Sequence, residues 1–144
     1  MQKQLFSLIV LALLAIAACT KKDNTDPAFK LDTPFLLNQA DSIPWEDDSA
    51  VQVRFNRVLG DSRCPIDVMC VWAGLAEVEL TFSQPGSTLT DTLVLGDFSG
   101  TSKTDLATFG VYSVRLLQVL PAPLSNVTIP QEDYVVKLEV KKSQ

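Results

Sequence analysis

Alternation of apolar and polar residues in five segments most limits what this chain can form. The segments cover residues 51–56, 77–82, 89–95, 112–116 and 134–141. Because successive side chains of a β-strand point to opposite faces, this period of two predicts strands that each bury one face. In the third segment, Leu89, Leu93 and Leu95 are expected to share that face, although Asp91 breaks the pattern.

A weaker opening strand over residues 29–37 is interrupted by Pro34, and turn-forming residues separate the other segments. About six or seven short strands spaced by turns predict an all-β domain over residues 29–142. We expect an antiparallel β-sandwich, either Ig-like or small barrel-like. No helix of ten or more residues is expected within it, although residues 106–109 could form one helical turn.

The apolar phase shifts in two places, at Val58-Leu59 and at Leu117 to Val119. Such a shift has two readings. Either the strand carries a bulge, or the strand is buried on both faces.

The N-terminus has the pattern of an export signal. Lys3 precedes an apolar run from Leu5 to Ala18, which is shorter than the roughly 20 residues of a membrane-spanning helix. The run ends in Ile16-Ala17-Ala18-Cys19, which resembles the lipobox of bacterial lipoproteins. This resemblance implies a cleaved signal peptide over residues 1–18 and a lipid anchor on Cys19. The alternative is an ordinary secretory signal followed by a chance cysteine.

The segment after the cleavage site is polar and predicts a flexible tether, so residues 19–28 are assigned to the lipidated cysteine and its linker. We therefore expect a protein of the cell envelope, attached to the outer membrane by its lipid. Lys21-Lys22-Asp23 only partly resembles the surface-export signal of Bacteroidetes-type lipoproteins, so facing toward the periplasm or the cell surface stays open.

Composition argues against several functions. The chain has no histidine, which removes His-based catalysis and His-ligated metals. Loss of Lys3 with the signal leaves 11 basic against 17 acidic residues, a formal net charge of −6, with no basic block in the body. We therefore expect no nucleic-acid binding. Without a nucleophile elbow or a phosphate-binding loop, we also expect no enzyme, no catalytic residues, no metal and no cofactor.

Two cysteines, Cys64 and Cys70, remain once Cys19 carries lipid. In an oxidising compartment they predict a disulfide that closes a short loop and stabilises the fold by about 2 kcal/mol. A metal site would want more ligands than two thiols. A redox pair usually has two intervening residues, whereas this pair has five. The disulfide is therefore interpreted as structural.

The cysteines lie in a run from Asp61 to Gly74 that reads DSRCPIDVMCVWAG and is expected to form a long loop between two strands. This run resembles an element, DSRCP…CVWAG, of small Bacteroidetes-type lipoproteins, a family without an established activity. The resemblance extends loosely over residues 29–142 and carries no catalytic residues. The candidate binding residues of the loop are Asp61, Arg63, Ile66, Asp67, Val68, Met69 and Trp72.

Each of these residues has a structural reading beside the functional one. Asp61 could pair with Arg63 or cap the loop backbone, whereas Arg63 could instead bind an anionic ligand. Trp72 could be an exposed platform, but a tryptophan in such a place more often packs over the disulfide or caps the core. Gly74 suggests a bulge or a close approach of two backbones.

Two further patterns are weaker. Three carboxylates in Trp45-Glu46-Asp47-Asp48 could help to hold Ca²⁺, but a solvated acidic turn is favoured over this reading. Ser42, Ser49 and Thr92 each follow an aspartate and precede an aliphatic residue or alanine. These short matches resemble O-glycosylation sites of Bacteroidetes secreted proteins.

Three functions remain open. The first is a lipid-anchored β-sandwich that binds an envelope protein, a glycan or a small ligand. The second is a structural component of the envelope, and the third is an inhibitor of secreted hydrolases that presents the Cys64–Cys70 loop. Exposure of Ile66, Val68 and Met69 would favour a partner or inhibitor, whereas burial under Trp72 would make the loop a plug.

Overall fold

The computed structural model describes residues 27–96 and 104–143, and these residues form an all-β fold of eight strands and one short 3₁₀ helix. The strands are β1 (Phe35–Asn38), β2 (Ser42–Trp45), β3 (Asp48–Asp61), β4 (Leu75–Gln84), β5 (Ser87–Gly96), β6 (Leu106–Phe109), β7 (Tyr112–Leu120) and β8 (Val135–Lys142). The helix η1 covers Gln131–Asp133. The expected signal peptide, Cys19 and most of the expected tether lie outside the described residues.

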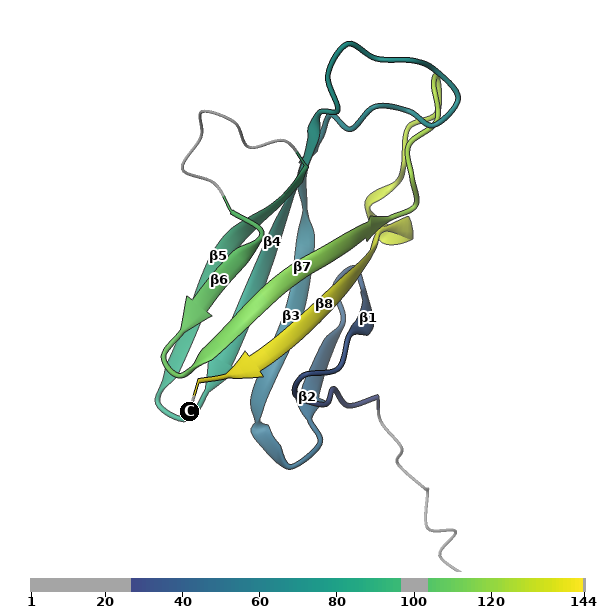
Figure 1. The fold of residues 1–144 in the computed structure, drawn as a ribbon. Coiled ribbons are helices and arrows are strands. Elements are labelled where there is room, and N and C mark those ends of the chain that lie inside the picture. The colour runs from purple at the N-terminus through teal and green to yellow at the C-terminus, as the bar shows by residue number, and fades with distance from the viewer. Residues whose placement is uncertain (1–26, 97–103, 144) are drawn as a thin grey trace, which may run out of the picture.

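The strands form two antiparallel sheets of four, in the orders β2-β3-β4-β5 and β1-β8-β7-β6 (Figure 1). Their inner faces pack together, and this layered arrangement is the predicted β-sandwich. Near the start of the described chain, Phe29 forms a parallel bridge with Trp45 and adds its ring to the core. At the other margin, Val94 N donates to Thr104 O and joins β5 to the segment before β6.

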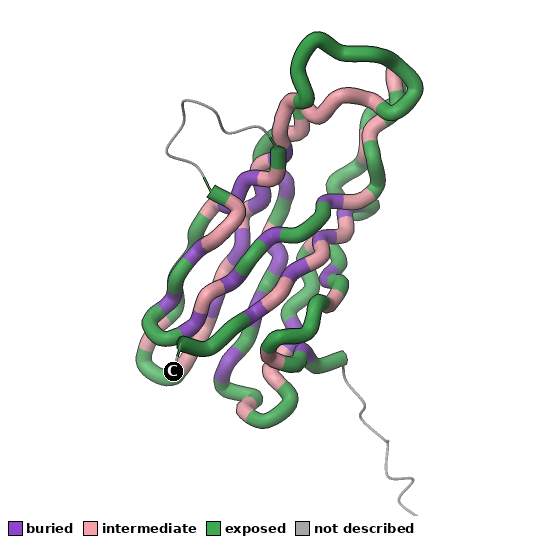
Figure 2. The backbone as a smooth tube through the Cα atoms, viewed as in Figure 1, coloured by how far each residue is buried: buried purple, intermediate pink, exposed green. Residues whose placement is uncertain are grey.

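The core consists of the inward members of the alternating segments. Figure 2 shows buried and exposed residues alternating along the long strands. In β3, for example, Val51, Val53 and Phe55 are buried while Gln52 and Arg54 are exposed. Phe82 stacks on Phe109 across the two sheets with their ring centroids 5.0 Å apart. The same alternation in β4, β7 and β8 confirms that period-two patterning selected the buried face.

Two strands were not anticipated as strands. The prediction of a helical turn at residues 106–109 was wrong, because these residues form β6 and pair with β7. β2 was missed because it has four residues and contains Pro44, which lies opposite Gln52 on an edge strand. A four-residue strand is too short to show periodicity, and its neighbour in the sheet decides its conformation.

Both phase shifts are bulges, and neither strand is buried on both faces there. The register between β3 and β4 shifts between Phe55 and Arg57 and again between Val58 and Gly60, so that Val58 is buried while Leu59 is exposed. A similar shift follows Leu116 in β7. These bulges let β3 continue for 14 residues, well beyond the alternating segment at 51–56.

The apolar face expected for residues 89–95 is only partly correct. Leu93 is buried in the core, whereas Leu89 is 48% exposed and Leu95 packs partly against the core. Val94 is fully buried although it lies outside the core cluster. β5 is the last strand of its sheet, so its burial depends on what covers it rather than on its own alternation.

The two ends of the sandwich differ in construction. The described chain begins, and β8 ends, at the end of the sandwich that also carries the β2–β3 hairpin (Figure 1). The long β3–β4 loop and the β7–β8 connection extend from the opposite end. β3 runs between these ends, which at about 3.3 Å per residue places them about 40 Å apart. In the part of the chain that the structure describes, no helix is long and apolar enough to cross a membrane.

Candidate functional site

The long loop between β3 and β4 begins and ends in a tight backbone stem. Ser62 N donates to Leu75 O and Cys64 N donates to Ala73 O, each at 2.8 Å, so that hairpin pairing continues past the strands. Gly74 has a φ of +66°, and a Cβ at this position would lie 1.8 Å from the carbonyl oxygen of Ser62. The expected close approach of two backbones is confirmed, and it excludes a side chain at residue 74.

The predicted disulfide between Cys64 and Cys70 is present, with the two Cα atoms 5.9 Å apart. It closes the outer part of the loop into a ring. Inside this ring Val68 N donates to Pro65 O at 3.3 Å and forms a turn. Residues 65–68 therefore form a hydrogen-bonded turn on one side of the ring.

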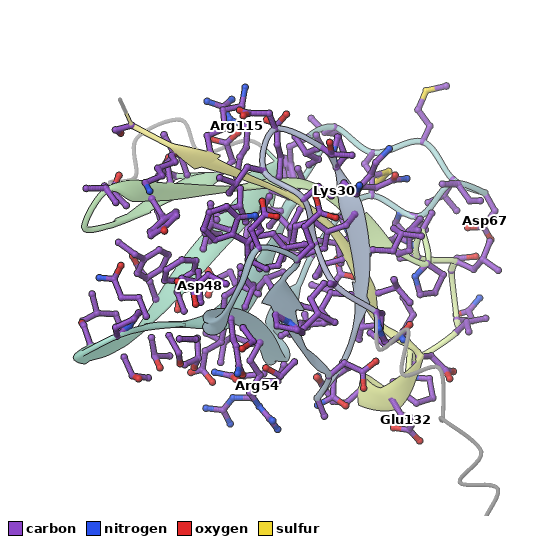
Figure 3. The ribbon with its side chains drawn as sticks, turned by 90° about the horizontal axis from the view of Figure 1, so that it is seen from below. Lys30, Asp48, Arg54, Asp67, Arg115 and Glu132 are labelled. Carbon is purple, nitrogen blue, oxygen red and sulfur yellow. A yellow bond between two sulfur atoms is a disulfide. The ribbon has the colours of Figure 1, made fainter. Side chains whose placement is uncertain are left out.

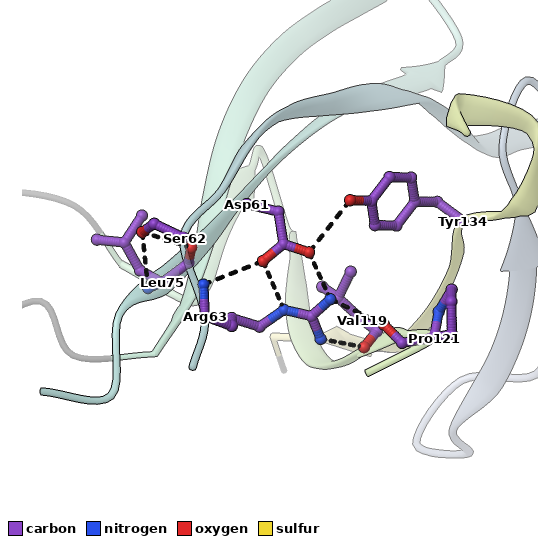
Figure 4. Close-up of polar contacts among 7 residues, drawn as sticks. All are labelled: Asp61, Ser62, Arg63, Leu75, Val119, Pro121 and Tyr134. Atoms are coloured by element: carbon purple, nitrogen blue, oxygen red, sulfur yellow. Dashed lines mark hydrogen bonds and ion pairs between the residues drawn. The ribbon is translucent and has the colours of Figure 1, made fainter. Parts of the chain in front are cut away.

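A charged pair at the base of the loop joins it to the opposite sheet (Figure 4). Arg63 Nε and Nη2 donate to the two carboxylate oxygens of Asp61 at 2.8 and 2.6 Å. Nη2 also donates to Pro121 O at 2.9 Å, and Nη1 donates to Val119 O. All three guanidinium nitrogens are therefore engaged within the chain. The reading of Arg63 as an anion site is wrong, and the pairing with Asp61 is confirmed.

Asp61 also fulfils the capping reading, because its Oδ1 accepts a hydrogen bond from Arg63 N at 3.2 Å, and Oδ2 accepts another from Tyr134 Oη at 3.1 Å. Burial raises the pKa of Asp61, but the hydrogen bonds and positive charge of Arg63 outweigh it and hold the pKa below its ordinary value of 3.8. Burial, then the charge and hydrogen bond of Asp61, raise the pKa of Tyr134 above 10.0. Asp61 and Arg63 are thus structural members of the loop base.

The β7–β8 connection, residues 121–134, braces the loop from the side. Asp67 Oδ1 accepts a hydrogen bond from Ser125 N at 2.8 Å, and Oδ2 accepts one from the Ser125 hydroxyl. Ile66 N donates to Pro123 O at 3.0 Å. The Ser125 hydrogen bonds lower the pKa of Asp67 below 3.8. Among the residues labelled in Figure 3, Asp67 lies on this outlying loop, away from Arg54 and Arg115 on the sandwich body.

Apolar side chains gather on the solvent side of these two connections. Met69 is 100% exposed, Val71 94%, Trp72 74% and Ile66 72%. The described residues contain twelve exposed large apolar side chains, and seven of them belong to this end of the molecule. We call these seven the apolar tip: Ile66, Val68, Met69, Val71 and Trp72 on the loop, with Leu124 and Val127 on the connection.

The exposure of the tip decides between the readings of the loop. Ile66, Val68 and Met69 project into solvent, so the loop is not a plug under Trp72. The expectation that Trp72 more often packs over the disulfide or caps the core is wrong here, because the side chain is mostly exposed. Between Cys64 and Gly74 the only charged residue is Asp67, which Ser125 engages, and residues 121–130 contain none.

The loop is braced unevenly. In its first half, the backbone N–H groups of Cys64, Ile66 and Val68 all donate within the chain. In its second half, residues 69–72, no backbone N–H or C=O group hydrogen bonds to any residue that the structure describes. This stretch is held only where Cys70 joins the disulfide and where Ala73 accepts from Cys64.

A groove of about 320 Å³ lies beside the loop base, between the end of β3 and the β7–β8 connection. Leu59, Val127 and Ile129 contribute apolar walls, and Tyr134 and Gln131 contribute polar groups. The Gln131 side chain is already engaged, because its Oε1 accepts from Val58 N at 3.0 Å and its Nε2 donates to Val58 O at 2.9 Å. The side-chain amide of Gln131 thus takes the place of a neighbouring strand beside Val58, on the side of β3 that faces away from β4.

The remaining candidates lie away from the tip. Glu46 pairs with Lys30 at 3.0 Å, and Asp48 Oδ1 accepts from Ala50 N at 3.0 Å, as expected of an acidic turn. Among the described residues, no group of three His, Cys, Asp or Glu side chains could hold a metal ion. Of the suggested glycosylation residues, Ser42 and Ser49 are exposed and Thr92 is half-buried in β5.

Sequence reasoning missed part of this site. Val71 stands inside the recognised motif but was not singled out, although it is among the most exposed residues of the tip. Ser125, Leu124 and Val127 lie about 58 residues further along the chain, in a segment without periodicity. Nothing local signals that this segment meets the loop.

The fold and the site together define a β-sandwich that presents a disulfide-closed apolar loop at one end. No family model, no curated protein sequence and no solved structure matches this chain.

Proposed function

We propose that this chain is a lipid-anchored protein of the bacterial cell envelope whose β-sandwich binds a protein partner through the apolar tip. The observation that carries the proposal is the gathering of seven of the twelve exposed large apolar side chains on two connections at one end. Exposed apolar clusters with few charges are typical of protein interaction sites. A purely structural envelope role would not account for this cluster.

The anchor supports the same assignment. The lipobox-like Ile16-Ala17-Ala18-Cys19 precedes the domain, and the described chain begins at the end of the sandwich opposite the tip. An anchor on Cys19 would therefore leave the tip directed away from that end. The disulfide adds to this, because a closed ring loses less conformational entropy on binding.

Other binding partners fit the tip less well. Peripheral insertion into a lipid surface usually combines apolar residues with Lys or Arg, and residues 64–74 and 121–130 contain neither. A glycan requires hydrogen-bonding side chains around an aromatic ring, but Trp72 is flanked in the chain by Val71 and Ala73. A protein surface with an apolar depression is the better match.

The experiment is site-specific photo-crosslinking from the full-length protein in cells. Benzoylphenylalanine is placed at Val71 in the tip, and at Val111 as a matched control. Val111 is an exposed apolar residue in the hairpin between β6 and β7, at the other end of the sandwich. We expect a protein adduct of defined mass from residue 71 only, which disappears when Trp72→Asp is added. Adducts with lipid only, no adduct, or equal adducts from both positions would contradict the proposal.

The anchor has its own test. Metabolic labelling with an alkyne fatty acid should tag the wild-type protein and not Cys19→Ser, and the variant should leave the membrane fraction. Continued labelling of Cys19→Ser would show that the cysteine is not the lipidated residue.

A further inference from the structure

We propose that the second half of the loop, residues 69–72, enters the substrate cleft of a secreted endopeptidase and blocks it, with Met69 in the pocket for an apolar substrate side chain. This inference rests on the proposed protein-binding function and specifies the partner. It is carried by the uneven bracing of the loop and by the complete exposure of Met69.

An endopeptidase binds its substrate as an extended segment, pairing with the substrate backbone and receiving side chains in pockets. Residues 69–72 offer unpaired backbone groups and exposed side chains, with no turn at residues 69 and 70 and a bend at residues 71 and 72. Their backbone N–H and C=O groups make no hydrogen bond with the described residues, and Met69, Val71 and Trp72 project into solvent. The braced half of the loop, by contrast, has its alternate N–H groups engaged and could not pair in this way.

The side chain of Met69 is suited to a deep apolar pocket. It is unbranched, flexible and fully exposed, and it is adjacent to Cys70, which the disulfide fixes in place. The Asp67–Ser125 hydrogen bonds and the Ile66–Pro123 hydrogen bond hold the preceding residues against the β7–β8 connection. Met69 therefore lies between the braced residues before it and the disulfide-bonded Cys70, and this limits the backbone freedom that it loses on binding.

Ring closure distinguishes such a loop from an ordinary substrate. Hydrolysis of the Met69–Cys70 peptide bond would consume one water and leave a carboxylate on Met69 and an amine on Cys70. Because the disulfide joins Cys64 to Cys70, the new termini would stay covalently connected, and the Asp67–Ser125 contact would hold the Met69 side. Products that cannot separate are released slowly and continue to occupy the cleft.

The test measures inhibition of chymotrypsin and subtilisin, two endopeptidases whose primary pockets accept large apolar side chains. The inhibitor is the mature chain, residues 19–144, with Cys19→Ser in every variant to remove the lipid. Hydrolysis of a chromogenic peptide gives the inhibition constant. We expect at least one enzyme to be inhibited, with a loss of tenfold or more for Met69→Asp, near-full retention for Met69→Leu, and no change for Val111→Asp.

Circular dichroism and thermal unfolding verify that every variant stays folded. Absence of inhibition of both enzymes, equal inhibition by Met69→Asp, or rapid cleavage with no occupancy of the enzyme would each overturn the inference. Failure of this inference can be distinguished from failure of the proposed function. If residue 71 crosslinks to a protein that is not an endopeptidase, the protein-binding function stands and only the inhibitor inference is lost. A lipid adduct would remove both proposals.

Discussion

Asp67 accepts hydrogen bonds from both the backbone N–H and the hydroxyl of Ser125, a residue 58 positions further along the chain. Together with the Ile66–Pro123 hydrogen bond, this contact joins the β3–β4 loop to the β7–β8 connection. The tip is therefore one surface built from two segments, and its shape depends on contacts that both segments supply.

Replacing Ser125 with alanine should loosen the loop without unfolding the sandwich. The variant keeps the backbone donor of Ser125 and loses the hydroxyl donor, so the Asp67 carboxylate is held by one bond in place of two. We expect faster hydrogen exchange at Ile66, whose N–H donates to the same connection, and unchanged exchange in β4 and β8. Thr90→Ala on the exposed face of β5 is the control. Unchanged exchange at Ile66 would show that the contact does not brace the loop.

Replacing Gly74 with alanine should be strongly destabilising. The added Cβ would lie 1.8 Å from the carbonyl oxygen of Ser62, at a φ of +66° that also disfavours a side chain. We expect the free energy of unfolding to fall by about 3 kcal/mol or more, measured by urea denaturation. Gly60→Ala is the matched control, because nothing lies within 4 Å of its added Cβ, and its effect should stay within about 0.5 kcal/mol. Similar losses for both variants would contradict this account.

Acid should weaken the base of the loop through Asp61. Its pKa in the folded protein lies below the ordinary value of 3.8, so the stability it contributes is present above that value and is lost as the pH falls through the folded pKa. Wild-type stability should therefore decline steeply below about pH 4. Asp61→Asn should lower stability at neutral pH and flatten that decline, as followed by urea unfolding from pH 2.5 to 7. An equally steep acid decline in the variant would assign the effect to other carboxylates.

Opening the disulfide should cost stability and the function of the tip together. The double variant Cys64→Ser/Cys70→Ser avoids a free thiol and should lower the free energy of unfolding by about 2 kcal/mol, the chain-entropy estimate for so short a ring. Neither cysteine belongs to the core cluster of the described residues, so far-ultraviolet circular dichroism should be retained. Crosslinking from residue 71 should weaken strongly. Retained crosslinking would reduce the disulfide to a staple and place the binding determinants elsewhere on the tip.

The roles of the loop residues were only partly predictable. Asp61 and Arg63 were expected either to pair or to bind a ligand, and the pairing holds because the carbonyl groups of Val119 and Pro121 complete the guanidinium's hydrogen bonds. Trp72 was expected more often to pack inward, but its side chain is mostly exposed, and none of the described elements buries it. For Arg63, residues distant in the chain decide the role of the side chain. For Trp72, the lack of a covering segment among the described residues decides its exposure.

The sequence by itself determined the all-β class, the buried faces of β3, β4, β7 and β8, and the disulfide. These properties are local, because alternation with a period of two and the spacing of two cysteines act within a few residues. Only the tertiary structure decided that Ser125 meets Asp67, that Gln131 closes the edge of β3 at Val58, and that seven apolar side chains are left exposed at one end. Each of these depends on contacts across more than 50 residues, and such contacts follow from how the sheets pack rather than from any local pattern.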